Sequence, residues 1–406
     1  MKELVVDNVK IWTLGEEGTI ENGWLYARDG IIAEIGEGPL PERLAGKGIQ
    51  EIDGKGRHLL PGLVDCHTHL MEYATSEIHQ TASPSAQRMA ATANLLLALR
   101  CGIVATGEHH LGHPILSMPM ETYRDILNEV PMASALAYGC CWLGFEPRVL
   151  TSCTRPGQAF TQDILTDEEY LAMARQSDFG GENLFMNYTC ANAPLDAVPH
   201  AGGVTYDREK LTHIIGLFHR EGKRIGAHIE GDDSARLFIE CGGDIIHHGH
   251  NLSPETADIM AAKGTRLVIT PLAGTSKRPT SPEETYSYYK KGVFLALASD
   301  SYIPPHPEAR WIPLPQGFLA GPQEFLTICG STVRYFIEQG VPVEEALRLI
   351  TVNGRKILWP DQPDATLSPG RPADMILCDQ LPAVESENAG CIRLVITQGE
   401  IQVCRL

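Results

Sequence analysis

The hydrophobic and polar positions of the chain follow one pattern at its two ends and another in its middle. Apolar and polar residues alternate between glycines in LVVDNVKIWT, GWLYARDGIIAEIG and GIQEIDGKGRHLLPG, and again in TLSPGRPADMILCD and CIRLVITQGEIQVCRL. A period of two is typical of half-buried strands, and glycine marks the turns between them. We therefore expect residues 1–58 and 366–406 to share a small β-domain.

The middle of the chain alternates helical stretches with short apolar runs. Helical segments such as SAQRMAATANLLLALRCG, DREKLTHIIGLFHREGK and SPETADIMAAKG precede short apolar runs, which include GIVATGEHH, RIGAHIEG, DIIHHGH, RLVITPLAG and FLALASD. Alternating helices and buried strands predict a parallel α/β domain, and residues 59–365 are numerous enough for an eight-stranded (β/α)8 TIM barrel with insertions.

Histidines and acids stand at the carboxyl ends of these apolar runs, which is where a parallel barrel builds its active site. His67 and His69 follow the run PGLVDC and are two residues apart. Side chains two apart on a strand point to the same side, so both imidazoles can approach one metal ion.

Two further runs supply an imidazole and carboxylates. RIGAHIEG ends with His228 and Glu230, and Glu230 is either a general acid or base or a helix-capping acid in a cluster with Asp232 and Asp233. FLALASD ends with Asp300. A carboxylate after so apolar a run is costly unless it is paired, hydrogen-bonded or metal-bound, so we expect Asp300 to be functional.

The run DIIHHGH contains three histidines, His247, His248 and His250. Strand alternation places His248 and His250 on one side and predicts that His247 packs outward on the other. We therefore select His248 for the site and keep His250 as a second candidate.

Three or four imidazoles and one carboxylate suit a divalent ion such as Zn²⁺, with Fe²⁺ and Mn²⁺ as alternatives. Such an ion activates water for attack. Asp300 beside that water would take its proton and pass it to a leaving nitrogen. The chemistry implied is hydrolysis.

The composition of the chain limits the classes of partner that we expect this protein to bind. The formal net charge of −18 argues against nucleic acid and anionic membrane, because both need clustered Lys and Arg. No run of about 18 apolar residues is present, and the start MKELVVDNVKIWTLG does not resemble a signal peptide. Eleven scattered cysteines fit reduced thiols, so we expect a cytoplasmic protein with a small-molecule substrate.

Several of these motifs resemble those of the metal-dependent amidohydrolase superfamily. They are PGLVDCHTHL, AHIEG, IIHHG and LASD, followed by TVNGRKIL and LSPGRPADMILCD, in the expected order over nearly the whole chain. The resemblance implies a distorted (β/α)8 barrel with a β-sandwich formed by both termini. It also implies that His67, His69, His228 and Asp300 bind the metal, and that His248 is a further ligand or positions water and substrate.

Two departures from the family pattern bear on the number of metal ions and on the branch of the family that we expect. Two-metal members carry a carboxylated lysine at the end of strand four, whereas ENLFMNYTCAN has no lysine or acid after its apolar run. This predicts a single ion and favours the branch of imidazolonepropionase and the cytosine, guanine and triazine deaminases. Deaminases usually place a glutamate three residues after the strand-five histidine, where this chain has Gly231, and strand seven reads more like that of cyclic amidases.

The leading hypothesis is therefore a hydrolase that cleaves a C–N bond of a cyclic or linear amide or amidine. A deaminase of purine, pyrimidine or triazine rings is the second, because GEHHLGHP resembles a deaminase segment in which His109 or His110 would contact substrate. A prolidase-type dipeptidase and a non-catalytic binding protein are further alternatives. Tyr302 is a candidate pocket residue, and we expect a homo-oligomer.

Overall fold

The computed structural model describes residues 2–46, 48–71, 83–111, 118–139, 165–188, 202–274 and 276–406, with the backbone but not the side chain of His110. The strands are β1 Glu3–Trp12, β2 Thr19–Arg28, β3 Ile31–Glu37, β4 Gln50–Pro61, β5 Leu63–Thr68, β6 Ile103–Leu111, β7 Ala133–Tyr138, β8 Leu184–Phe185, β9 Gly226–Glu230, β10 Ile245–His250, β11 Arg266–Ile269, β12 Leu295–Leu297, β13 Met375–Cys378, β14 Ile392–Thr397 and β15 Glu400–Cys404. The helices are α2 Pro84–Arg100, α3 Met120–Glu129, α4 Asp167–Gln176, α5 Arg208–Arg220, α6 Asp232–Glu240, α7 Pro254–Lys263, α8 Pro282–Lys290, α9 Phe325–Glu338, α10 Val343–Arg348 and α11 Val352–Leu358, with short 3-10 turns η1 Glu42–Leu44, η4 Pro322–Glu324 and η5 Ala389–Cys391.

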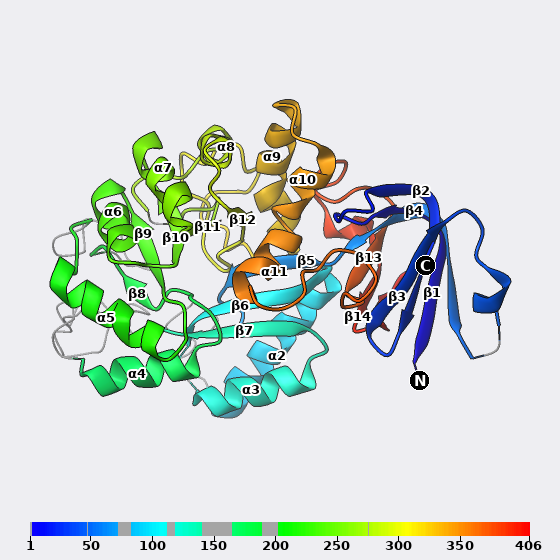
Figure 1. The fold of residues 1–406 in the computed structure, drawn as a ribbon, viewed down its shortest axis with the longest axis horizontal. Helices are drawn as coiled ribbons and strands as arrows, with labels where there is room; N and C mark the ends of the chain where they lie inside the picture. The colour runs from blue at the N-terminus through cyan, green and yellow to red at the C-terminus, as the bar shows by residue number, and fades with distance from the viewer. Residues whose placement is uncertain are drawn as a thin grey trace.

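The two ends of the chain share one seven-stranded sheet, as their alternating pattern predicts. Its strand order is β15-β14-β13-β4-β1-β2-β3, and β13–β15 come from the C-terminal end. Figure 1 shows both termini on this sheet, to one side of the helices. Val6 packs into an apolar cluster with Leu394, whereas its neighbour Val5 packs with Trp24 in a different cluster. Apolar residues therefore cover both faces of the sheet.

The middle of the chain forms two parallel sheets, which confirms the α/β prediction. One has the order β12-β11-β10-β9-β8 and the other β5-β6-β7. Helices α2–α8 alternate with these strands along the chain. The end of β5 lies beside the segment that follows β12, through a parallel bridge between Thr68 and Ser301 and a hydrogen bond from His69 N to Ser301 O of 3.1 Å. The first and last strands of the series therefore meet where the predicted site residues stand.

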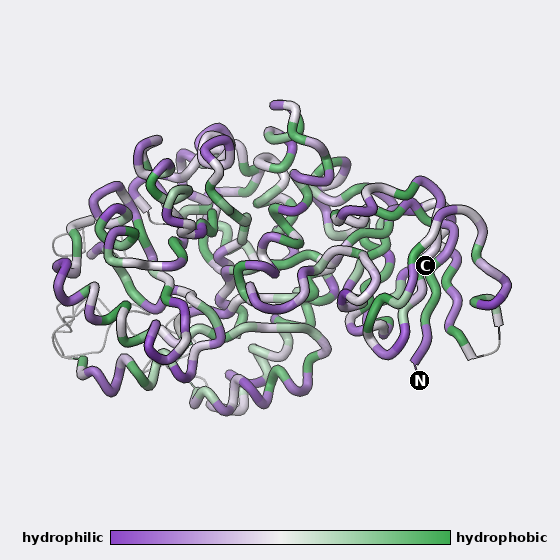
Figure 2. Tube along the Cα trace, viewed as in Figure 1, coloured by the Kyte–Doolittle hydropathy of each residue, from purple (hydrophilic) through white to green (hydrophobic). Residues whose placement is uncertain are grey.

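Local sequence explains where several of these helices begin. Thr166 and Glu169 form a capping box at α4, and Ser281 and Glu284 form another at α8. Each box satisfies backbone N–H groups that the first helical turn leaves without partners. Figure 2 shows hydrophobic segments running through the strands, whereas helices such as α4 and α5 also carry hydrophilic positions.

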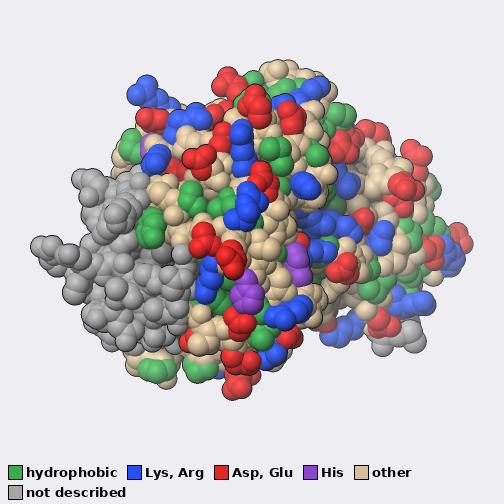
Figure 3. Space-filling model, turned by 60° about the vertical axis from the view of Figure 1, so that its left-hand side comes forward, with side chains coloured by type: hydrophobic (Ala, Val, Ile, Leu, Met, Phe, Trp, Pro, Cys, Tyr) green, Lys and Arg blue, Asp and Glu red, His purple; other side chains and the backbone are tan. Residues whose placement is uncertain are grey.

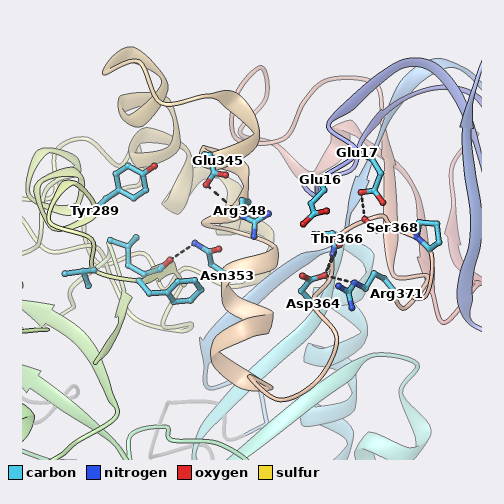
Figure 4. Close-up of a pocket in the computed structure, with 15 residues that line it drawn as sticks. Glu16, Glu17, Tyr289, Glu345, Arg348, Asn353, Asp364, Thr366, Ser368 and Arg371 are labelled. Atoms are coloured by element: carbon cyan, nitrogen blue, oxygen red, sulfur yellow. Dashed lines mark hydrogen bonds and ion pairs between the residues drawn. The ribbon is translucent and has the colours of Figure 1, made fainter. Parts of the chain in front are cut away.

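A cavity of about 760 Å³ lies between the terminal sheet and the parallel strands, away from the predicted site. Figure 4 shows its charged side chains pairing within the cavity wall: Arg371 Nε lies 3.0 Å from Asp364, and the Ser368 hydroxyl donates to Glu17 at 2.6 Å. None of the predicted site residues lines this cavity.

On the face shown in Figure 3, Lys and Arg side chains are interspersed with Asp and Glu. Within the described residues, none of the helices is both long enough and apolar enough to span a membrane.

Candidate metal centre

The end of β5 and the turn after β12 bring two imidazoles onto one carboxylate. Asp300 Oδ1 lies 3.4 Å from His67 Nε2 and 3.2 Å from His69 Nε2. A backbone hydrogen bond from Asp300 N to His67 O, 2.9 Å long, fixes the two segments against each other. His67 and His69 thus point to the same side, as their spacing predicts.

A second carboxylate, that of Glu182, enters the cluster from the segment just before β8. Its Oε1 atom lies 3.2 Å from His228 Nδ1 of β9, 3.7 Å from His67 Nε2, and in hydrogen-bond contact with His248 Nε2 of β10. Only 3% of the Glu182 side chain is exposed. A carboxylate this deeply buried is strongly destabilising unless cationic or hydrogen-bonding partners surround it.

His248 completes the cluster by linking the two carboxylates. Its Nδ1 atom lies 2.7 Å from the Thr270 hydroxyl and 3.6 Å from Asp300 Oδ2, while Nε2 contacts Glu182. His248 and Asp300 both have positive φ angles, 69° and 55°. Such backbone conformations cost about 1–3 kcal/mol each and concentrate at functional sites.

His247 also points inward, so the prediction that it packs outward is wrong. Its Nδ1 atom lies 2.9 Å from His67 Nδ1, and its Nε2 atom lies 3.0 Å from the carbonyl of Gly180. The left-handed backbone at His248, with a register shift against β9 between His248 and His250, ends the simple alternation of the strand. Adjacent histidines can then both face the interior.

The electrostatics of the cluster separate the roles of its groups. Burial would raise the pKa of Asp300, but its contacts with His67 and His69 outweigh burial and hold that pKa well below its usual value. Burial also opposes protonation of His69, yet the hydrogen bond and charge of Asp300 raise its pKa to about 9. Burial lowers the pKa of His67 to about 4. Asp300 is therefore ionised.

The donor set fits a divalent cation. The Nε2 atoms of His67 and His228 are buried, and neither makes a hydrogen bond of good geometry within the described residues. Among the described residues, four groups of side chains converge closely enough to hold an ion, and three of them contain Asp300 or Glu182: His67, His248 and Asp300; His67, His69 and Glu182; and Glu182, His228 and His248. The fourth is His67, His109 and His247. A bound cation would neutralise the buried carboxylates, and the unpartnered nitrogens would coordinate it.

A further carboxylate beneath the cluster supports the turn that carries Asp300. Asp65 accepts hydrogen bonds from Ser299 N at 2.9 Å and from the Ser299 hydroxyl at 2.5 Å. Burial raises the pKa of Asp65 to about 7. Asp65 therefore couples β5 to the segment after β12 from inside the protein.

The model of the Amidohydrolase family matches residues 58–402, which include all of these side chains. The chain belongs to the amidohydrolase family. It is consequently a metal-dependent hydrolase that acts on carbon–nitrogen bonds other than peptide bonds, in accordance with the sequence resemblance.

Imidazolonepropionases are among the similar amidohydrolases. The chain is 44% identical over 378 residues to the imidazolonepropionase of Mesorhizobium japonicum, covering 89% of this chain and 87% of the relative. It is 41% identical over 314 residues to that of Methylobacterium nodulans, covering 72% and 76%.

Solved amidohydrolase structures share the fold. A crystal structure described as an amidohydrolase superposes with a TM-score of 0.73 at 16% identity, with all of both chains covered. A prolidase complexed with N-methylphosphonate-L-proline gives a TM-score of 0.73 at 17% identity, covering 99% of this chain and 100% of that one. At such identities the likeness concerns the fold alone.

The remaining predicted residues of this amidohydrolase lie around the cluster. Glu230 accepts hydrogen bonds from Lys277 N at 2.5 Å and Asn251 Nδ2 at 3.2 Å, and its buried Oε2 atom has no partner within the described residues. His250 Nδ1 lies 2.8 Å from the Thr280 hydroxyl, and its buried Nε2 atom likewise has no partner there.

Three other predicted substrate contacts have different surroundings. Tyr302 donates its hydroxyl to Asn94 Oδ1 at 2.9 Å, which anchors it to α2. His109 is fully buried and stacks on His67, with ring centroids 3.9 Å apart, so its position favours support of His67 over contact with substrate. The side chain of His110 lies outside the described residues.

The residue that sequence reasoning missed is Glu182. The family pattern places a lysine or acid after the apolar run of strand four, whereas Glu182 precedes that run. The only signal in the sequence is a lone acid between two glycines and an asparagine, GGEN, which by itself does not indicate a site.

Proposed function

We propose that this amidohydrolase opens a cyclic amide or amidine by hydrolysis of a C–N bond, in the manner of imidazolonepropionase. The observation that carries the proposal is the pair of buried carboxylates, Asp300 and Glu182, surrounded by imidazoles. Similarity to imidazolonepropionases over most of both chains supports the substrate class.

His67, His69, His228 and Asp300 would hold the ion, with His248 as a further ligand or a positioning group. A divalent ion supplies Lewis acidity and the activation of water. Asp300 would accept the proton from the attacking water and deliver it to the leaving nitrogen. Its low pKa keeps it in the ionised form that this first transfer requires.

We propose Zn²⁺ as the ion, with Fe²⁺ and Mn²⁺ as alternatives, because imidazole and carboxylate ligands suit all three. The sequence predicted one ion because no lysine or acid follows the apolar run of strand four. Glu182 supplies one and belongs to two of the candidate ligand groups. Its shared position supports a second ion.

Glu230 and His250 would contact the substrate. They are register neighbours at the ends of β9 and β10, and each keeps one buried polar atom without a partner within the described residues. An unsatisfied buried polar atom costs about 1–3 kcal/mol, which a substrate amide would offset by pairing with it. Glu230 remains the candidate for a second proton-transfer group.

The further alternative from the sequence, a prolidase-type dipeptidase, would cleave a peptide bond, unlike the carbon–nitrogen bonds on which this family member acts. Prolidases normally rely on a bridging carboxylated lysine, which this sequence lacks after strand four, but Glu182 offers a carboxylate nearby. The structural likeness to a prolidase is compatible with this alternative at the level of fold.

The test is a product-resolved assay on protein reconstituted separately with Zn²⁺, Mn²⁺ and Fe²⁺. Three groups of substrates are tested. The first is an imidazolone bearing a propionate chain together with other cyclic amides, the second is aminopurines and aminopyrimidines, and the third is Xaa-Pro dipeptides. We expect a ring-opened product without ammonia, and no turnover by the chelator-treated protein. Ammonia release from an aminopurine or aminopyrimidine would replace the proposal with deamination, and release of proline would replace it with dipeptidase activity.

We further propose that β5–β12 close into the distorted (β/α)8 barrel, with a β-sandwich formed by residues 1–58 and 366–406. The Thr68–Ser301 bridge supports closure at one seam. At the other seam, between β7 and β8, Asn183 Nδ2 donates to the carbonyl of Tyr138 at 2.9 Å. A cytoplasmic location and a homo-oligomeric state remain predictions from the sequence.

A further inference from the structure

Three buried histidines, two from adjacent strands of one parallel sheet and one from the other parallel sheet, form a block beneath the metal cluster. They are His67 of β5, His109 of β6 and His247 of β10, and none has exposed surface. His67 belongs to both the block and the cluster, because its Nε2 atom faces Asp300 while its Nδ1 atom faces His247. The other two histidines have no role in the function proposed above.

The hydrogen bonds of the block determine which nitrogens carry protons. His247 Nε2 lies 3.0 Å from the Gly180 carbonyl, which can only accept, so this nitrogen donates. In a neutral imidazole the other nitrogen is then an acceptor. His67 Nδ1, at 2.9 Å from His247 Nδ1, must therefore be the donor. With its proton on Nδ1, His67 directs the Nε2 lone pair towards Asp300 and Glu182.

His109 fixes the plane of the same ring. It stacks on His67 with centroids 3.9 Å apart and an interplanar angle of 18°. Its Nε2 atom lies 3.3 Å from the Cys66 carbonyl and donates to it, and its Nδ1 atom accepts from Glu182 N at 2.9 Å. Both nitrogens are thus engaged. The three rings converge closely enough to hold an ion, but their hydrogen bonds leave His109 and His247 no free lone pair for one.

We propose that His247 is a positioning residue that holds His67 in the Nδ1–H tautomer and aims its Nε2 lone pair at the metal. The inference rests on the metal centre proposed above. Metal-bound histidines generally donate their second N–H to a carboxylate, a carbonyl or water. Here the acceptor is a neutral imidazole, which orients His67 without adding a third buried negative charge beside Asp300 and Glu182.

The test compares His247→Leu with His247→Gln. Leucine fills the space but offers no acceptor to His67. Glutamine carries an oxygen and an NH₂ group at nearly the separation of the two ring nitrogens, so it can accept from His67 and donate to Gly180. The matched control is His58→Leu, which removes a half-buried histidine from the terminal sheet, where His58 Nδ1 accepts from Trp12 Nε1 at 3.1 Å.

The measurement is the Kd of each protein for Zn²⁺, by competition with a chromophoric chelator, together with the visible spectrum of the Co²⁺ form. We expect a roughly 10–100-fold weaker Kd and an altered Co²⁺ spectrum for His247→Leu, the usual effect of losing such a partner. We expect values near those of the wild type for His247→Gln and His58→Leu. An unchanged Kd in His247→Leu would overturn the inference.

A second measurement does not depend on any variant folding. A two-bond ¹H–¹⁵N correlation NMR spectrum of wild-type protein labelled with ¹⁵N-histidine reports which ring nitrogen of each histidine is protonated. We expect a proton on Nδ1 of His67 and on Nε2 of His247, and protonation of His67 at Nε2 instead would overturn the inference. A wild-type protein that binds no divalent ion refutes the proposed centre itself, whereas tight binding that is indifferent to His247→Leu refutes only the positioning role.

Discussion

Replacing Glu182 by glutamine tests whether this carboxylate is shared between two ions. The change keeps the shape of the side chain and removes its charge. Glu182 Oε1 lies 3.2 Å from His228 Nδ1 and 3.7 Å from His67 Nε2. Two of the four groups of side chains that converge for an ion contain Glu182, and the group of His67, His248 and Asp300 does not. The variant should therefore weaken both groups that contain Glu182 and keep a single ion, held by the intact group of His67, His248 and Asp300.

The size of the effect follows from the loss of an anionic donor. In the variant, each group that contains Glu182 keeps two donors and exchanges its anionic carboxylate oxygen for a neutral amide oxygen, which is a much weaker ligand. Loss of an outer partner alone weakens metal binding by about 10–100-fold, so loss of a direct ligand should exceed the upper figure. A 100-fold change corresponds to about 2.8 kcal/mol of binding free energy. At a metal concentration that just saturates the wild type, the weaker site of the variant should be nearly empty.

The assay is elemental analysis of Zn²⁺-reconstituted protein after gel filtration, with chelator competition for the two dissociation constants. We expect two equivalents in the wild type and one in Glu182→Gln. Glu240→Gln is the control, because Glu240 is an exposed acid whose ion-pair partner is Arg208. One equivalent in the wild type, or two tightly bound equivalents in Glu182→Gln, would show that Glu182 is not shared.

Three other predictions follow from the same structure. Asp300→Asn should lower kcat by about 10²–10⁴-fold with little change in the far-UV circular dichroism spectrum, because it removes the proton acceptor and keeps its shape; a near-normal kcat would contradict the assigned role. Chelation of the metal should lower Tm by roughly 3 °C relative to protein held at 100 times Kd, where binding stabilises the fold by about 2.7 kcal/mol, and a Tm independent of metal would argue against a site formed only in the folded state. Phe238→Ala should reduce the free energy of unfolding by about 3–5 kcal/mol in urea titrations because Phe238 is fully buried. Phe294 is 40% exposed, so Phe294→Ala should reduce the free energy of unfolding much less. Equal losses in the two variants would show that burial does not determine the cost of removing the ring.

The sequence predicted most of the fold because its hydrophobic periods are strong. The alternating ends pair into one sheet, and the helix-then-strand middle gives parallel strands flanked by helices. The weakest prediction concerns strand four. β8 is only two residues long, Leu184–Phe185, and so short an element carries little periodicity of its own.

The sequence also predicted that His67, His69 and Asp300 lie close together, since residues at the carboxyl ends of parallel strands meet at one edge of the sheet. It misplaced His247 because side-chain alternation holds only while the backbone stays extended. The positive φ of His248 interrupts the strand, and that angle depends on tertiary contacts such as the bond from His248 to the Thr270 hydroxyl, 22 positions away.

Glu182 could not be predicted from the sequence for a different reason, because its position depends on neighbours that the local sequence does not identify. Three of the hydrogen bonds that fix the segment around it are as follows: Glu182 N donates to His109 at 2.9 Å, Asn183 Oδ1 accepts from Gly226 N at 3.1 Å, and the Gly180 carbonyl accepts from His247. Two of the three involve the histidine block. The block therefore orients His67 on one side and fixes the backbone of Glu182 on the other, so a single buried substitution at His109 should disturb both candidate ligands at once.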